Sequence, residues 1–116
     1  MQSIRDKILN AKDIKEDIME IEEWDVTLLV RGMTGQQRAD LLQSALDDDG
    51  KVNMASAYPI ILVSSIYDPD TREHIFTKKD IALLNEKSGG VMERIAMRCM
   101  QLSGLSKEDV STARKN

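Results

Sequence analysis

The sequence predicts an α+β fold, mostly α, with an N-terminal β-hairpin followed by a small bundle of four to five helices. Three observations support this prediction. Apolar and polar residues alternate on both sides of Trp24, a helix-capping pattern begins at Thr34, and apolar residues recur at helical spacing after Ser88. A chain of 116 residues is expected to form one domain. Its predicted parts are a short helix or flexible arm over 1–12, the hairpin over 13–33 and the helical bundle over 34–113.

The first two elements are the short helix and the hairpin. Ser3 is placed to cap a helix that ends near Asn10. After an acidic run, Met19 and Ile21 alternate with glutamates, and the stretch Val26–Arg31 alternates in the same way. No Asn-Gly or Asp-Gly pair marks the turn, so the sequence leaves the turn type open. The acids on the first strand discourage pairing with another strand edge.

Thr34 begins the first helix of the predicted bundle. Thr34 and Gln37 have the spacing of a capping box, in which each side chain accepts a hydrogen bond from the backbone N–H of the other residue. The helix is expected to run to about Leu46. The acids of Asp47–Asp49 would be unfavourable at a helix C-terminus, so we place the helix end before them.

The stretch Asn53–Tyr67 is apolar on nearly all sides and predicts the central buried helix. Pro59 is compatible with the first turn of a helix that begins at Ser56, whereas a helix that begins at Asn53 is expected to kink. A buried strand over Ile60–Ser64 is the alternative, because periodicity does not separate the two structures in a short apolar run.

Thr77 is the start signal of the next helix. Asp80 stands three residues later, and Phe76 and Ile81 have the spacing of a hydrophobic staple. We expect this helix to end near Lys87, where the chain turns into the C-terminal helix.

The C-terminal helix has the widest apolar face. Ser88 is placed to cap it, and Gly104 suits the left-handed position just past its end. At about 100° per residue its apolar residues span about half the circumference, more than the usual core-facing stripe. We expect the surplus to contact a partner protein. Ser106 and Asp109 predict one last short turn of helix.

Five residues form the predicted partner-contact set. Flexible thioether side chains suit adaptable surfaces, and Met97 lies beyond the apolar arc among polar neighbours. The same methionine spacing is also typical of a core. A tryptophan at the hairpin tip is as compatible with partner contact as with folding back over the core. The predicted set is Met92, Met97, Met100, Leu105 and Trp24.

Composition restricts the partner and the compartment. The net charge is −4 and no basic stripe is present, which argues against a nucleic-acid partner. No apolar run approaches the roughly 20 residues of a membrane span, and no signal peptide is evident. The single cysteine excludes an internal disulfide and fits a reducing compartment. We therefore expect a soluble, intracellular protein that binds other proteins.

No catalytic, cofactor or metal site emerges from the sequence. His74 is the only histidine, and with Cys99 it does not complete a four-ligand zinc site. The aspartates before Gly50 lack the first ligand and the bidentate acid of a calcium loop. Cys99 falls inside the apolar arc and is expected to be a buried, inert thiol. The chain is therefore predicted not to be an enzyme and to hold no cofactor.

Several sequence pieces occur together in a characteristic order. They are an acidic extended run before Trp24, then Val30-Arg31-Gly32-Met33-Thr34-Gly35, Phe76-Thr77-Lys78-Lys79-Asp80-Ile81, Lys87-Ser88-Gly89 and Leu102-Ser103-Gly104-Leu105. In this order they resemble the tail assembly chaperones of long-tailed bacteriophages and related prophages, over roughly 13–113. The stretch 47–57 departs from the family pattern.

The resemblance implies a non-catalytic protein in the cytoplasm of a bacterial host, absent from the mature virion. It implies binding to the long tape measure protein, which stays soluble while tail-tube subunits polymerise around it. It also implies self-association and a frameshifted longer form of the chain. The alternative function is that of a small acidic regulatory or adaptor protein that acts through protein–protein binding, or less readily through DNA binding.

Overall fold

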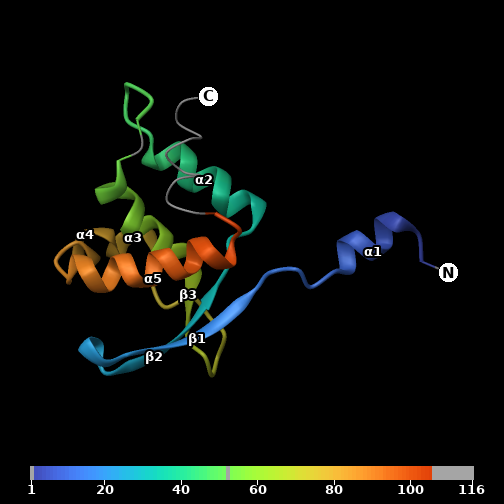
Figure 1. Cartoon of the computed structure of the whole chain (residues 1–116), viewed down its shortest axis with the longest axis horizontal. Coiled ribbons are helices and arrows are strands. Elements are labelled where there is room, and N and C mark those ends of the chain that lie inside the picture. The colour runs from blue at the N-terminus through green and yellow to red at the C-terminus, as the bar shows by residue number, and fades with distance from the viewer. Residues whose placement is uncertain (1, 52, 106–116) are drawn as a thin grey trace.

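The computed structural model describes residues 2–51 and 53–105 and confirms the α+β fold with an N-terminal hairpin (Figure 1). The predicted last turn at Ser106 lies outside the described residues. The elements are α1 (Ile4–Asn10), β1 (Glu16–Ile21), β2 (Val26–Arg31), α2 (Gly35–Ala45), α3 (Met54–Ser65), β3 (Ile66–Tyr67), α4 (Ile81–Leu84) and α5 (Gly89–Leu102), with the 3₁₀ turns η1 (Glu22–Trp24) and η2 (Lys78–Asp80).

β1 and β2 form the predicted antiparallel hairpin, with Ile18 opposite Leu29 and Ile21 opposite Val26. The turn consists of η1 followed by Asp25, whose backbone is left-handed (φ 53°). The sequence did not predict the third strand of the sheet. β3 pairs antiparallel with β2, so that the strand order is β1-β2-β3.

α3 is the helix predicted for the central apolar stretch, and the alternative strand is wrong. Pro59 is the sixth residue of α3 and is fully buried, so the helix accepts the loss of one backbone donor in its second turn. The prediction that the helix continues to Tyr67 is also wrong. The hydroxyls of Ser64 and Ser65 donate to the carbonyl of Ile61 (3.1 and 2.6 Å), and the helix ends there. The next two residues pair with β2 instead.

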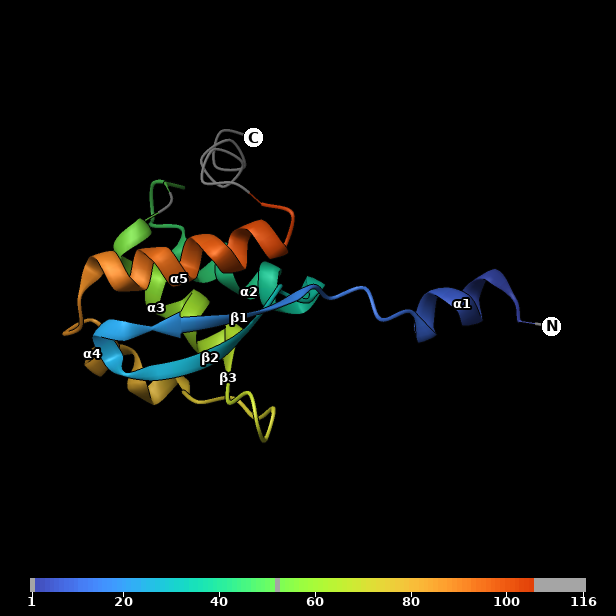
Figure 2. The same cartoon turned by 60° about the horizontal axis from the view of Figure 1, so that its bottom comes forward.

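α5 lies across one face of the hairpin (Figure 2) and packs against α3 as well as β2. α2 packs against α3, so the helices build up over one side of the sheet. The buried side chains form one core cluster, in which Ile21 and Val30 of the sheet join Ile61 of α3 and Ile95 of α5. Because α5 has neighbours on two sides, its wide apolar face is occupied within the chain. The buried residues of α5 are Val91, Met92, Ile95, Ala96, Cys99 and Met100.

Both ends of α5 follow the sequence prediction. The hydroxyl of Ser88 accepts a hydrogen bond from the N–H of Val91 (3.3 Å). Gly104 is left-handed (φ 76°), and the N–H of Leu105 donates to the carbonyl of Met100 (2.7 Å). This hydrogen bond to the carbonyl five residues earlier is the 6→1 bond of a Schellman motif. It fixes the direction in which the chain leaves the helix.

The helix predicted from Thr77 to Lys87 is shorter in the structure. The carboxylate of Asp80 accepts from the N–H of Thr77 (2.9 Å), as the capping pattern predicts. η2 and the single turn of α4 follow, and the N–H of Lys87 donates to the carbonyl of Leu84 (3.0 Å), only three residues back. The chain is turning into α5 at this point, so the helical bonds do not continue.

α1 stands apart from the rest of the molecule in both views (Figures 1 and 2). None of its residues is buried. Its N-terminus is capped as predicted, because the hydroxyl of Ser3 accepts from the N–H of Asp6 (3.1 Å). We call residues 2–12, which comprise α1 and the start of the linker to β1, the arm.

Candidate protein-binding surface

The five predicted contact residues do not share one surface. Met92, Met100 and Leu105 are buried, with exposed fractions of 3%, 0% and 8%. Met97 and Trp24 are half-buried and pack at the margin of the core. Only these two are therefore accessible to a partner without a rearrangement, and their role stays a prediction.

Trp24 lines an apolar groove at the closed end of the hairpin. The groove has a volume of about 390 Å³ and lies between η1 and the segment that carries α4. Leu83 is 61% exposed at this groove, whereas Leu84 beside it is 3% exposed. We call this feature the tip groove. Its lining residues are Trp24, Phe76, Asp80, Leu83, Leu84 and Lys87.

The single turn of α4 explains why one leucine remains open. Consecutive helical residues point about 100° apart, so Leu83 and Leu84 do not face the core together. Leu84 enters the core, and Leu83 stays at the groove. Leu83 and Phe76 were not predicted from the sequence as surface residues. The signal was the pair of adjacent leucines, because side chains about 100° apart on a helix do not face the same neighbour.

The hairpin turn beside the tip groove is acidic. Arg94 of α5 binds Glu23 through two hydrogen bonds (2.8 and 3.0 Å). Hydrogen bonding to this guanidinium is the main cause that lowers the pKa of Glu23 to about 2, and it raises the pKa of Arg94 in turn. The turn keeps a net negative charge, because residues 20–25 hold four acids and no base: Glu20, Glu22, Glu23 and Asp25.

A second apolar surface lies on α1, at the opposite end of the molecule from the hairpin turn (Figure 1). Ile4, Ile8 and Leu9 are 77%, 67% and 63% exposed. Ile4 and Ile8 are four residues apart and lie on one side of the helix, so they form an apolar stripe, whereas Leu9 points about 140° away from Ile4. The arm also carries Arg5, Lys7 and Lys12 against the single acid Asp6, a net charge of +2.

Two of the sequence pieces that carry the family resemblance meet at a structural joint. Gly32 follows β2 and lies against the last turn of α5, where an added Cβ would be 2.8 Å from the carbonyl oxygen of Leu102. The N–H of Met33 donates to the hydroxyl of Ser103 (2.8 Å), which donates to the carbonyl of Cys99 (2.7 Å). These residues hold the sheet against the helix, so they belong to the scaffold.

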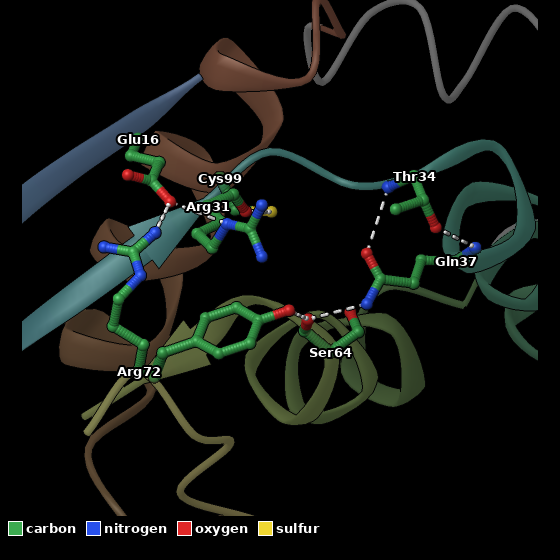
Figure 3. A network of polar contacts seen from close by, with 8 residues as sticks. Glu16, Arg31, Thr34, Gln37, Ser64, Arg72 and Cys99 are labelled. Atoms are coloured by element: carbon green, nitrogen blue, oxygen red, sulfur yellow. Dashed lines mark hydrogen bonds and ion pairs between the residues drawn. The ribbon is translucent and has the colours of Figure 1, made fainter. Parts of the chain in front are cut away.

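Polar contacts around this joint tie α2 to α3 (Figure 3). The side-chain oxygen of Gln37 accepts from the N–H of Thr34 (3.0 Å), and the hydroxyl of Thr34 accepts from the N–H of Gln37 (3.1 Å), as the capping box predicts. The amide nitrogen of Gln37 also donates to the carbonyl of Ser64 (3.1 Å). One side chain therefore caps α2 and fixes it to the end of α3.

Glu16 at the start of β1 lies between two guanidinium groups (Figure 3). Its carboxylate is 2.8 Å from Nε of Arg31 and also binds Arg72. The guanidinium of Arg31 lies 5.3 Å from the ring centre of Tyr67. This cluster joins the first residue of β1, the last residue of β2 and the loop after β3 at one end of the sheet, so it stabilises the surface there.

Cys99 is a buried free thiol, as the sequence predicted. Burial raises its pKa, and its S–H lies 3.6 Å from the carbonyl oxygen of Arg31. Within residues 2–51 and 53–105, no three metal-binding side chains gather at one point. No helix in the described part of the chain is long and apolar enough to cross a membrane.

Comparison with known proteins rests on the fold. No family model and no curated protein matches the sequence. Among solved structures, the bacteriophage HK97 tail assembly chaperone matches with a TM-score of 0.63 and 17% sequence identity, over 83% of this chain and 89% of that one. The chain therefore has the fold of the HK97 tail assembly chaperone, in agreement with the resemblance of its sequence pieces.

Proposed function

We propose that this protein is a phage tail assembly chaperone that binds the tape measure protein and keeps it soluble during tail assembly. The observation that carries the proposal is the shared fold, which extends over 83% of this chain and 89% of the HK97 protein. The order of the sequence pieces that resemble the family supports the same proposal. The proposal includes a cytoplasmic site of action in the host and absence from the finished virion.

The proposed mechanism is contact without catalysis. A long helical client exposes apolar stripes that aggregate when they are not covered. The tip groove offers Leu83, Phe76 and Trp24 to such a stripe, in the manner of a helix in a groove. The net charge of −4 keeps the complex soluble once the apolar surface of the client is covered.

The test is co-expression of the full chain with the tape measure protein of the same phage or prophage. We expect the soluble fraction of the tape measure protein to rise with the chain present and to fall again with Leu83→Asp. The matched control is Ile18→Asp, because Ile18 is similarly exposed (56%) but lies on β1 outside the tip groove. Equal solubility of the tape measure protein with and without the chain would reject the proposal.

Self-association and a frameshifted longer form also belong to the proposed function. The longer form would share the tip groove and carry a different, longer C-terminal part. Mass spectrometry of the chaperone isolated from its natural host checks for two forms, and a single species would remove the frameshifted form from the proposal.

A further inference from the structure

The tip groove and the arm are complementary surfaces at opposite ends of the same chain. The groove is apolar, with Leu83 open at its edge, and the arm carries an apolar stripe of Ile4 and Ile8. Within residues 2–51 and 53–105, nothing covers either surface. From this we infer that the arm of one copy occupies the tip groove of a second copy.

Charge complementarity favours a second copy as the occupant. The arm has a net charge of +2. On one side of the groove, residues 20–25 carry four acids, one of which is paired with Arg94, and on the other side residues 76–87 carry three lysines and two acids, so the charges around the groove sum to −2. Arg5 and Lys7 flank the apolar stripe of α1, so an arm seated in the groove brings them toward the acidic turn. Opposite charges at the rim guide the approach and set the orientation, while the apolar contacts supply most of the affinity.

The arm meets the groove of another copy more easily than its own. The linker over 11–15 spans about 17 Å when fully extended, and the six residues of β1 run for about 20 Å in the opposite direction. An arm that folds back onto its own groove would need a reversed and fully extended linker. The arm of a second copy needs no such change, because it already projects into solvent.

An arm at one end and a groove at the other define a head-to-tail contact. Each copy then uses its groove for one neighbour and its arm for the next, so the contacts form a chain or a closed ring. The contact involves one short helix, so we expect weak and reversible assembly. This contact gives the proposed self-association a surface and competes with the client for the same tip groove. The test uses the purified chain without a client, so a failed test of self-association leaves the proposed client binding undecided.

The test is complementation between two variants of the full chain, measured by sedimentation velocity. Ile8→Asp damages the arm and leaves the groove intact, whereas Leu83→Asp damages the groove and leaves the arm intact. We expect wild-type oligomers that grow with concentration, and each variant alone to associate at least about tenfold more weakly. A mixture of the two variants is expected to form a 1:1 dimer and nothing larger, because only one intact arm and one intact groove remain.

The control variant is again Ile18→Asp, which leaves both surfaces unchanged and is expected to assemble like wild type. Raising the salt concentration from roughly 0.05 M to 0.5 M should weaken assembly, since the rim charges are screened. If Leu83→Asp fails to fold by circular dichroism, a mixture of Ile8→Cys and Leu83→Cys replaces it, and a disulfide-linked dimer is expected. A monomeric wild type, variants that assemble like wild type, or a mixture without dimers would each overturn the inference.

Discussion

α5 and α1 are both capped by a serine and both carry an apolar stripe, yet only one stripe is covered. α5 buries six residues, and Ile95 is 0% exposed, whereas α1 buries none and Ile8 is 67% exposed. The difference lies in what surrounds each helix. α5 has the sheet on one side and α3 on the other, while α1 lies away from the body and is joined to β1 by the linker over 11–15. Helical periodicity therefore reveals an apolar face but does not say what covers it.

The largest expected effect is the difference in stability loss between a substitution in α5 and one in α1. Ile95→Ala should lower the free energy of unfolding by about 2–5 kcal/mol, because it leaves a cavity in a fully buried position. Ile8→Ala should change it by less than about 0.5 kcal/mol. Urea unfolding followed by the fluorescence of Trp24, the single tryptophan, measures both. A similar loss in the two variants would mean that α1 packs on the body in solution.

The next largest loss of stability is expected from a substitution at the joint between β2 and α5. Gly32→Ala should cost about 1–3 kcal/mol of unfolding free energy, because its Cβ would be 2.8 Å from a backbone oxygen that has little freedom to move. Gly35→Ala is the matched control. An added Cβ there meets nothing within 4 Å, so the variant should be neutral or more stable by up to about 1 kcal/mol. Thermal unfolding of the two variants checks the contrast, and equal effects would contradict the close approach.

A smaller loss is expected from Ser103→Ala. The variant leaves the N–H of Met33 without its acceptor, and Met33 is only 7% exposed, so we expect a loss of about 1 kcal/mol. The control is Ser44→Ala on the exposed side of α2, which should stay within about 0.5 kcal/mol of wild type. Amide hydrogen exchange at Met33 gives a direct measurement, and unchanged protection of this amide would show that the bond is dispensable.

The smallest expected effect is the pH dependence of the ion pair beside the tip groove. The pKa of Glu23 is about 2 in the folded chain and 4.5 ordinarily, so the pair favours folding above pH 4.5. This contribution is lost as the pH falls toward 2. Carboxylate chemical shifts of Glu23 should titrate near pH 2 in wild type and at a higher pH, closer to the ordinary value, in Arg94→Gln. A wild-type midpoint near 4.5 would show that the pair does not form in solution.

The candidate surface was predicted only in part. Trp24 belongs to both the predicted set and the tip groove. The prediction of Met92 and Met100 rests on the wide apolar arc of their helix, but α3 and the sheet divide that arc between them. Leu83 falls within the longer helix that the sequence predicts, and the one-turn α4 leaves it exposed instead. Each difference arises because a residue is exposed only where no other element packs against it. The local sequence pattern does not show which elements pack there.

The sequence by itself determined the local elements: the serine caps at Ser3 and Ser88, the capping box at Thr34, the hairpin around Trp24 and the left-handed end at Gly104. These signals act between residues a few positions apart, so they do not depend on the rest of the fold. The tertiary structure alone decided that Ile66 and Tyr67 form a strand, that α5 is covered on two sides and that α1 is covered on none. Strand pairing and burial depend on elements distant in sequence, and only the folded chain brings those elements together.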